Sequence, residues 1–598
     1  MGMDIKQGWN TWNVRSVLSH VHLPEGIALS LGLKVYDQGT CLREALIGRK
    51  GKSDERIVPG HHACDGSYTS LELEWHELKV RVETAVEDGE WFALVTPLSK
   101  LVKTPALTTE GAVLWNRPGS VTRDGEKLVI QGGDKRVVVC ASGTHREGEP
   151  VVEIASPYLL VALDGPVSVA TDSAKLKEVP AIIERKKNAF LESRNGEGRR
   201  QEIYDAMQAC LAWGTIYDPF KDRVISPVSR IWSCSSGGWV LFDWDTYFAA
   251  WMAGLENKEL AYANAVAITE EATESGFIPN FAHPSGFKSR DRSQPPVGGI
   301  TVRALCDMFD ETVLAERLFN ALLKWNRWWP EHRDRDGYLC WGSDPYEPVS
   351  GNLWETRGVN ERFGGALESG LDNSPMYDDV PFDTESHLLL LADVGLMSLY
   401  IADCKALADL AARIGRDEVV DELNERAERY SEKLKTLWSE EAALFLNKRL
   451  DTGEFQHRLS PTHFYPLLAE VPTQEQAKRM IDEHFFNEDE FFGEWILPSI
   501  ARDDPAYGDQ RYWRGRIWAP MNFLVYLGLR NYDLPKAREA LVEKSEALLL
   551  KEWREKGHVH ENYNADTGEG CDVPNSDAFY HWGGLLGLIS VLEHGTDT

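Results

Sequence analysis

The first 170 residues or so alternate between apolar and polar positions in short runs, a pattern typical of β-strands. Dipeptides that favour tight turns separate several of these runs, among them Asp88-Gly89, Asp124-Gly125 and Gly132-Gly133. Short strands at such regular spacing predict a β-sandwich. The predicted strands are residues 27–35, 71–86, 91–95, 127–130, 136–141 and 158–163.

The apolar spacing changes to a helical period at about residue 200. One helix face is formed by Leu407, Leu410, Ala411 and Ile414. We expect Gly415 to end this helix and Asp417 to cap the next. The buried side of that next helix is predicted to be Val420, Leu423, Ala427, Tyr430, Leu434 and Leu437. Many helices with few strands between them fit a ring of paired helices, although a helical solenoid has the same periodicity.

These patterns predict three parts in a chain that is too long for one compact core. Residues 1–172 form the β-sandwich, residues 173–200 a helical linker rich in Lys and Glu, and residues 201–598 the helical domain. A long loop insertion is expected around 330–385, and polar, aromatic-rich loops at 278–298 and 494–518. Loops of this length are usually functional, so the chemistry is sought there.

Charge narrows the class of partner. The chain has 94 acidic and 64 basic residues, a formal net charge of −30. Such a surface repels phosphate backbones and anionic lipid, so we expect neither a nucleic acid nor a membrane as a partner. The 21 tryptophans favour a sugar-binding site slightly, because indole rings stack on the apolar faces of sugars.

The nine cysteines are scattered and form no CxxC pair, which argues against a disulfide framework or a zinc ribbon. The start of the chain lacks the basic and apolar regions of a secretion signal. We therefore expect a cytoplasmic protein. No HExxH, GxSxG or P-loop motif occurs, and we predict no cofactor and no catalytic metal.

Two acidic residues stand in contexts that suit hydrolysis of a glycosidic bond, which needs one carboxylic acid and a second carboxyl group. Asp372 lies in the longest loop, after the glycines 364 and 365 and before Pro375. Glu561 lies among aromatic and amide side chains in the segment His558-Val559-His560-Glu561-Asn562-Tyr563-Asn564. Local context alone favours a turn or helix cap for Asp372 and a surface acid for Glu561.

Six motifs favour catalytic roles for these two residues instead. The motifs occur in the same order as similar motifs in trehalases and processing α-glucosidases, which they resemble. The motifs are Phe242-Asp243-Trp244-Asp245-Thr246-Tyr247-Phe248, Gly276-Phe277-Ile278-Pro279-Asn280, Arg292-Ser293-Gln294-Pro295-Pro296, Glu368-Ser369-Gly370-Leu371-Asp372, Tyr512-Trp513-Arg514-Gly515-Arg516-Ile517-Trp518 and Glu561-Asn562-Tyr563-Asn564. Together, over about residues 230–590, they resemble glycoside hydrolase family 63.

The resemblance implies an α+β multidomain protein, in which an N-terminal β-sandwich precedes an (α/α)6 barrel, and inversion at the anomeric carbon. By position, Asp372 is the acid and Glu561 the base. The substrate-binding residues that it implies are Trp244, Asp245, Asn280, Arg292, Gln294, Gly370, Tyr512, Trp513 and Trp518. Arg292 and Arg514 either bind substrate or only pair with a carboxylate. Trehalases carry Trp where this chain has Leu371, so a trehalase is not expected.

The sequence therefore predicts an inverting, exo-acting α-glycosidase that acts on a small-molecule glycoside or oligosaccharide. An α-glucosidase for a disaccharide or short oligosaccharide is the first choice, and an α-mannosidase or glycosylglycerate hydrolase is the alternative. A non-catalytic sugar-binding protein is the alternative from another class. Residues 341–362 match no motif of the family, and Trp354, Glu355 and Arg357 there are candidates for the leaving-group subsite.

Overall fold

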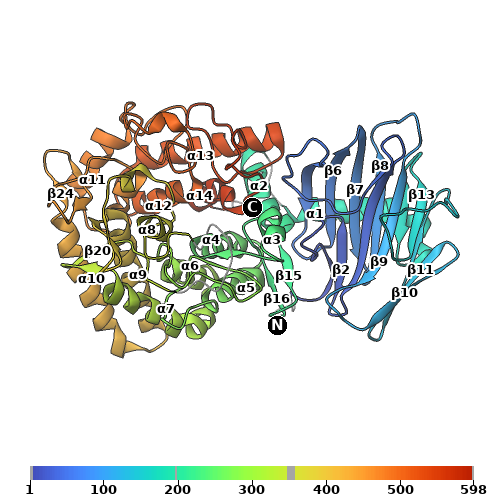
Figure 1. The fold of residues 1–598 in the computed structure, drawn as a ribbon, viewed down its shortest axis with the longest axis horizontal. Coiled ribbons are helices and arrows are strands. Elements are labelled where there is room, and N and C mark those ends of the chain that lie inside the picture. The colour runs from blue at the N-terminus through green and yellow to red at the C-terminus, as the bar shows by residue number, and fades with distance from the viewer. Residues whose placement is uncertain (1–4, 195–197, 347–356, 596–598) are drawn as a thin grey trace. The chain divides into compact units, whose positions relative to one another are not determined.

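A computed structural model describes residues 5–194, 198–346 and 357–595 of the chain. Contacts divide it into two compact units: one runs to Trp239 and includes Lys556–His558, and the other comprises Val240–Glu555 and the residues from Val559 on. The long strands lie in the first unit and most of the helices in the second (Figure 1). This division confirms the predicted α+β class.

The first unit contains two antiparallel sheets. The six-stranded sheet has the order β1 (Gly8–Asn10), β2 (Ser19–Leu23), β3 (Ile27–Val35), β9 (Ala106–Val113) and β13 (Tyr158–Ala162), with β4 (Thr40–Leu42) paired to β3. The eight-stranded sheet has the order β10 (Gly119–Asp124), β11 (Lys127–Gly132), β12 (Lys135–Ala141), β14 (Val167–Ala170), β8 (Glu90–Pro97), β7 (Leu78–Glu87), β6 (Tyr68–Trp75) and β5 (Arg56–His62). Strand β11 contacts both β3 and β9, so residues of the two sheets meet.

The predicted single strand at 71–86 is wrong, because it is a hairpin of β6 and β7. Trp75 pairs with Leu78, which leaves a two-residue turn at His76 and Glu77. Both turn residues have positive φ, 46° and 66°. Two-residue hairpin turns require such backbone angles, but they normally use Gly or Asn. Neither residue type marks the turn here, so the alternating pattern runs through it without a visible break.

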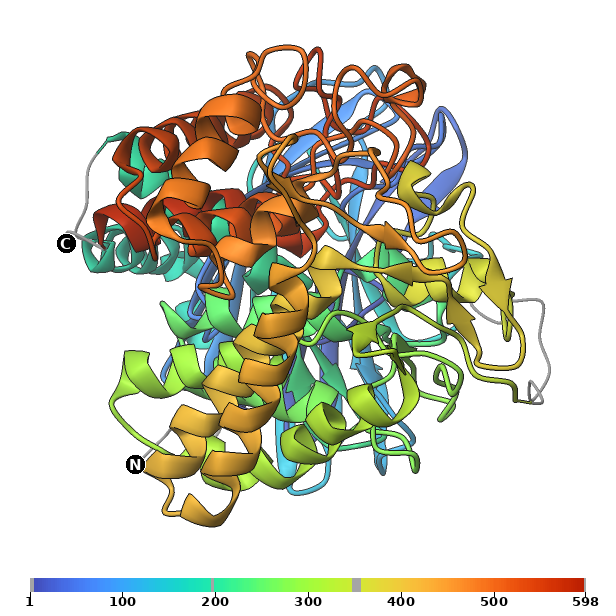
Figure 2. The same cartoon turned by 90° about the vertical axis from the view of Figure 1, so that its left-hand side faces the viewer.

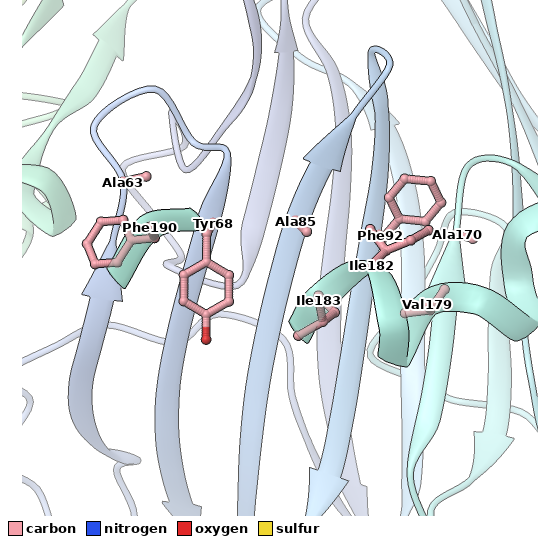
Figure 3. Packing of buried hydrophobic residues seen from close by; sticks show 9 residues of the cluster. All are labelled: Ala63, Tyr68, Ala85, Phe92, Ala170, Val179, Ile182, Ile183 and Phe190. Atoms are coloured by element: carbon pink, nitrogen blue, oxygen red, sulfur yellow. The ribbon is translucent and has the colours of Figure 1, made fainter. Parts of the chain in front are cut away.

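The predicted helical linker packs on the eight-stranded sheet. It consists of the short helix η1 (Ser173–Glu178) and α1 (Val179–Ser193). Figure 3 shows the apolar side of α1 against the strands. The buried cluster there consists of Val179, Ile182, Ile183 and Phe190 of the helix with Ala63, Tyr68, Ala85, Phe92 and Ala170. The first unit then continues through α2 (Arg199–Gly214), β15 (Ile216–Asp218), β16 (Arg223–Ile225) and α3 (Arg230–Ser235). The helical unit therefore begins later than the predicted residue 201.

The second unit is built from helices that contact one another in a closed order (Figures 1 and 2). Its principal helices are α4 (Asp243–Gly254), α5 (Lys258–Thr269), α6 (Gly298–Phe309), α7 (Val313–His332), α8 (Arg362–Glu368), α9 (Val394–Arg413), α10 (Val420–Lys435), η5 (Pro461–Leu467), α11 (Gln474–Met480), α12 (Ala519–Leu529), α13 (Pro535–Lys556), η8 (His581–Gly584) and α14 (Leu585–His594). Helix α4 contacts α6, α6 contacts α9, α9 contacts η5, η5 contacts α12, α12 contacts α14, and α14 returns to α4.

The burial of each helix follows from its place in this order. All residues of α4 and of α12 are buried, as expected of helices that are apolar on every side. Helix α10 is amphipathic and buries Leu423, Ala427, Tyr430 and Leu434, four of the predicted positions. Gly415, with φ of 71°, follows α9 as predicted. The prediction for Asp417 is wrong, because Asp417 is the first residue of a short 3-10 helix rather than the cap of α10.

The loop insertion predicted around 330–385 contains more regular structure than expected. Pro330 lies within α7, which ends at His332, and α8 lies inside the same segment. Trp354 and Glu355 lie outside the described residues, while the side chain of Arg357 is exposed. Within the described parts of the chain, no helix combines the length and the apolar composition that a bilayer crossing requires.

The packing of α1 gives a stability prediction. Ile182 is 1% exposed, so Ile182→Ala leaves a cavity beside the sheet and should lower the free energy of opening by about 2–5 kcal/mol. Leu191→Ala on the same helix is the control, because Leu191 is 43% exposed and its truncation should cost within about 0.5 kcal/mol. Hydrogen exchange of peptides from β7 and β8 measures both values. Equal losses in the two variants would contradict this packing.

Candidate active site

Glu561 is buried and held from both sides of its carboxyl group. Its Oε1 accepts a hydrogen bond of 3.0 Å from the hydroxyl of Tyr512, and its Oε2 accepts one of 3.2 Å from the backbone N–H of Asp577. Its own backbone N–H donates to the carbonyl of Asp577 at 2.9 Å, and its carbonyl accepts from Nε1 of Trp582 at 2.9 Å. Four hydrogen bonds therefore fix both the backbone and the carboxyl group.

The surroundings of Glu561 favour its neutral form. Burial raises its pKa well above the usual value, and the negative charges of Asp577 and Asp372 raise it further. The hydrogen bonds from the Asp577 backbone and from Tyr512 act in the opposite direction, because they stabilise the carboxylate. Perturbation of this kind is common in groups that transfer protons.

Asp245 is a second buried carboxyl group of the same site. It lies in the first turn of α4, and its Oδ1 accepts a hydrogen bond of 2.8 Å from the hydroxyl of Tyr580. Burial raises the pKa of Asp245 to about 7, and the charge of Asp372 contributes, while the bond from Tyr580 opposes the shift. The sequence motifs predict Asp245 as a site residue, but they do not identify Tyr580, which is 335 residues away.

Asp372 follows α8 on a tightly turned segment. Helix α8 ends at Glu368, and Gly370 has φ of 72°, a left-handed conformation that favours glycine. A Cβ atom on Gly370 would lie 2.7 Å from Cζ2 of Trp244, so the backbone also approaches that indole closely. Asp372 is partly exposed, and its charge raises the pKa of Glu561, of Asp245 and of Tyr512. The structure thus brings the two predicted carboxyl residues into one electrostatic neighbourhood.

Glu368, two residues before Gly370, is anchored in the interior. Arg333 donates to its two carboxylate oxygens at 2.7 and 2.9 Å, and the backbone N–H groups of Ser293 and Gly342 donate at 3.0 and 2.6 Å. Both charged side chains are fully buried. In the sequence Glu368 stands out only as part of a motif, and its partner Arg333 carries no signal that would identify the pair.

Tryptophans form one wall of the site. Trp513 and Trp518 stack with ring centroids 3.5 Å apart, and Trp244 stacks on Trp513 at 6.2 Å. Trp582 meets Trp244 and Trp518 edge-on at 5.5 and 5.4 Å. Three of these residues were predicted, and Trp582 was not, although it lies in the aromatic segment that follows Glu561. Planar apolar surface next to carboxyl groups is what sugar binding requires.

The remaining predicted residues contact the backbone that supports the site. The backbone N–H of Asp243 donates to the carbonyl of Asn280 at 3.2 Å, and the N–H of Asn280 donates to the carbonyl of Arg292 at 3.2 Å. Burial and the charge of Asp245 raise the pKa of Asp243 well above its usual value, and the backbone of Gln294 opposes this shift. Asn280, Arg292 and Gln294 are all buried, and their contact with a substrate stays a prediction.

Arg292 and Arg514, whose roles the motifs leave open, both pair with carboxylates. The guanidinium of Arg292 donates to Asp291 at 2.8 Å. Arg514 donates to Asp509 at 2.6 Å and to Asp378 at 2.9 Å. Among the described residues, no group of three or more His, Cys, Asp and Glu side chains is placed to hold a metal ion.

A family model described as the mannosylglycerate hydrolase MGH1-like glycoside hydrolase domain matches residues 239–582, more than half of the chain. The chain belongs to this family. The predicted membership of glycoside hydrolase family 63 is confirmed. The chain is therefore a glycosidase, and not the non-catalytic sugar-binding protein that was the alternative.

Relatives of this chain carry two enzyme names, mannosylglycerate hydrolase and mannosyl-oligosaccharide glucosidase. The mannosylglycerate hydrolase MGH1 of Selaginella moellendorffii is 25% identical over 405 residues, which cover 55% of this chain and 76% of that protein. The mannosyl-oligosaccharide glucosidase of Saccharomyces cerevisiae is 25% identical over 305 residues, which cover 46% of this chain and 35% of that protein. A bacterial glucoamylase solved with acarbose has a TM-score of 0.52 over 98% of this chain and 94% of its own, at 11% identity, a likeness of fold alone.

Proposed function

We propose that this glycosidase inverts the anomeric configuration of a terminal α-linked sugar, with Asp372 as the acid and Glu561 as the base. The observation that carries the proposal is the fixed carboxyl group of Glu561, held by Tyr512 and Asp577 within the field of Asp372. We also propose that the closed order of helices is the (α/α)6 barrel and that the two sheets form the β-sandwich of the family. Helix-connecting loops then close one end of the site, which favours removal of a terminal sugar.

In this reaction the carboxylic acid of Asp372 gives its proton to the glycosidic oxygen as the bond to the anomeric carbon breaks. A water molecule attacks that carbon from the opposite face, and the carboxylate of Glu561 accepts the water proton. The products are the free sugar of inverted configuration and the protonated leaving group. Two carboxyl groups that hold a water between them are about 6.5–9.5 Å apart in inverting enzymes, and we expect that spacing here.

The raised pKa of Glu561 sets a condition on this role. A general base acts only when it is ionised, so turnover should increase as the pH rises through the pKa of Glu561. Tyr512 and the Asp577 backbone supply the hydrogen bonds that make ionisation possible in a buried position. Asp245, with its pKa of about 7, is suited to exchange hydrogen bonds with a sugar hydroxyl in either protonation state.

For the substrate we propose a glycosylglycerate, with a small α-glucoside as the second candidate. The family model and the Selaginella relative carry the name mannosylglycerate hydrolase, and that relative is matched over most of its length. A local observation agrees: Asn373, next to the proposed acid, donates to the carbonyl of Arg511, whose exposed guanidinium pairs with no carboxylate in the described part of the chain. A free cation there suits an anionic leaving group. The Saccharomyces relative keeps the α-glucosidase, our first choice from sequence, as the alternative.

Removing either carboxyl group tests the catalytic assignment. Asp372→Asn and Glu561→Gln should each lower kcat about 10²–10⁴-fold, because each removes one proton transfer. Glu569→Gln, an exposed acid on the same segment as Glu561, is the matched control and should retain full activity. Product release is followed with α-mannosylglycerate, α-glucosylglycerate and α-linked glucose disaccharides.

Near-normal turnover by either variant would refute the role of that residue. Faster hydrolysis of the glucose disaccharides than of both glycosylglycerates would favour the second substrate candidate. Failure of the unsubstituted enzyme on every α-linkage of the panel would contradict the substrate proposal without affecting family membership.

The surroundings of Glu561 predict opposite pH shifts in two variants. Tyr512→Phe removes a donor to the carboxylate, so the pKa of Glu561 rises and the acidic limb of kcat/KM moves to higher pH. Asp577→Asn keeps the backbone N–H but removes a negative charge, so the acidic limb moves to lower pH. Glu569→Gln should leave both limbs in place. Movement of the alkaline limb instead would mean that Glu561 is the acid.

A further inference from the structure

A cavity of about 300 Å³ opens within the helical unit. Its walls come from α4, α6, α9 and α12 and from the turns that follow η5 and α12. The residues that line it are Trp251, Ile300, Arg303, Ala304, Asp307, Ala402, Lys405, Leu468, Glu470, Leu527, Arg530 and Asn531. A volume of this size lies at the lower end of the range for small-molecule sites.

This cavity is separate from the candidate active site, although both use the same helices. Trp244 lies at the start of α4, whereas Trp251 follows seven residues later, about 10 Å along the helix axis. Trp518 immediately precedes α12, whereas Arg530 immediately follows it, about 18 Å further along. The two sites thus lie at opposite ends of α4 and α12.

The floor of the cavity is apolar. Trp251, Ile300 and Leu527 are buried side chains that nevertheless line it, and Ala402 and Leu468 complete the surface. An indole beside branched aliphatic groups presents a surface on which the C–H face of a sugar ring can rest. The rim supplies hydrogen-bonding groups, including the amide of Asn531 and the carboxylate of Glu470.

The rim also carries two guanidinium groups, those of Arg303 and Arg530. Within the described residues, Arg303 and Arg530 form no ion pair with any carboxylate. By contrast, the third cation, Lys405, donates to the carbonyl of Ala469 at 2.7 Å and has Glu470 at 3.9 Å. Asp307, the other acid of the rim, is paired with Arg413 at 2.5 Å.

We propose that this cavity binds a phosphorylated monosaccharide. The two guanidinium groups match the nearly double negative charge of a phosphate monoester, and arginine is well suited to bind phosphate through paired N–H groups. The apolar floor accommodates the sugar ring. The amide of Asn531 can donate hydrogen bonds to the sugar hydroxyls, and the carboxylate of Glu470 can accept hydrogen bonds from them. The proposal rests on this cavity alone and does not depend on the substrate of the active site.

Mannose 6-phosphate is the probe, measured by isothermal titration calorimetry on the intact protein. Mannose at the same concentrations is the neutral control, and inorganic phosphate is the control without a sugar. The titration is repeated with saturating mannose present throughout, so that a sugar-binding active site is already occupied. Mannose 6-phosphate should bind at least tenfold more tightly than either control, and added mannose should not abolish this binding.

Variants place the binding in the cavity. Arg303→Gln and Arg530→Gln should each weaken the binding of mannose 6-phosphate at least tenfold. Arg317→Gln is the matched control, because Arg317 pairs with Glu270 and does not line the cavity. All three variants should keep the hydrolytic activity measured without the probe, since none of these side chains belongs to the active site.

Three outcomes would overturn the proposal. The first is that mannose 6-phosphate does not bind, and the second is that it binds equally well to both cavity variants. The third is that inorganic phosphate binds as tightly as the sugar phosphate, which would leave only an anion site. Glu561→Gln should lose hydrolysis but bind mannose 6-phosphate as tightly as the unsubstituted protein. This result would show that the cavity binds its ligand independently of the active site.

Discussion

The geometry of the candidate site depends on the buried ion pair between Glu368 and Arg333. The carboxylate accepts two bonds from the guanidinium and one each from the backbone of Ser293 and Gly342. It therefore joins the end of α8 to two segments that are distant in sequence. Removing one partner of such a pair leaves an uncompensated buried charge, at a cost of about 3–5 kcal/mol. The hydrogen bonds of Glu368 and Arg333 compensate the burial of their charges. The chain segment that leads to Asp372 can therefore be fixed in the interior.

The two proposed catalytic carboxyl groups, Asp372 and Glu561, have different surroundings. Glu561 is buried, and its hydrogen bonds from Tyr512 and Asp577 stabilise the charged form that a base needs. Asp372 lies four residues beyond the ion pair on a partly exposed turn. Their environments are coupled, since the charge of Asp372 raises the pKa of Glu561 and of Asp245. The reaction requires one proton to leave and one to arrive, and coupled groups in unlike settings suit that exchange.

Local patterns in the sequence predict local structure well. The alternation over β3 and the glycine at the end of α9 both correspond to observed elements. The turn between β6 and β7 was missed because His76 and Glu77 adopt positive φ without being glycine or asparagine. The loop predicted to begin around residue 330 begins later, because Pro330 lies inside the last turn of α7 and does not end that helix.

Motif order identified the family. It also predicts Asp245 and the tryptophans at 244, 513 and 518 as site residues, because they stand in recognisable neighbourhoods. It could not identify the bonds between distant residues, such as Tyr580 with Asp245 or Arg333 with Glu368. Those pairs join separate helices and loops, and each partner alone is an ordinary polar residue in the sequence. The surroundings that favour the neutral form of Glu561 likewise arise only when the segments around residues 512, 561 and 577 meet.

The anomeric form of the first product tests the central claim most directly. The enzyme is mixed with an α-linked substrate that it cleaves, and the anomeric proton of the released sugar is followed by ¹H NMR from the first minute, before mutarotation. Water activated by Glu561 on the face opposite the leaving group must give the β-anomer first. Initial release of the α-anomer would contradict the account, because it would require a covalent intermediate and a carboxyl group that attacks the sugar itself.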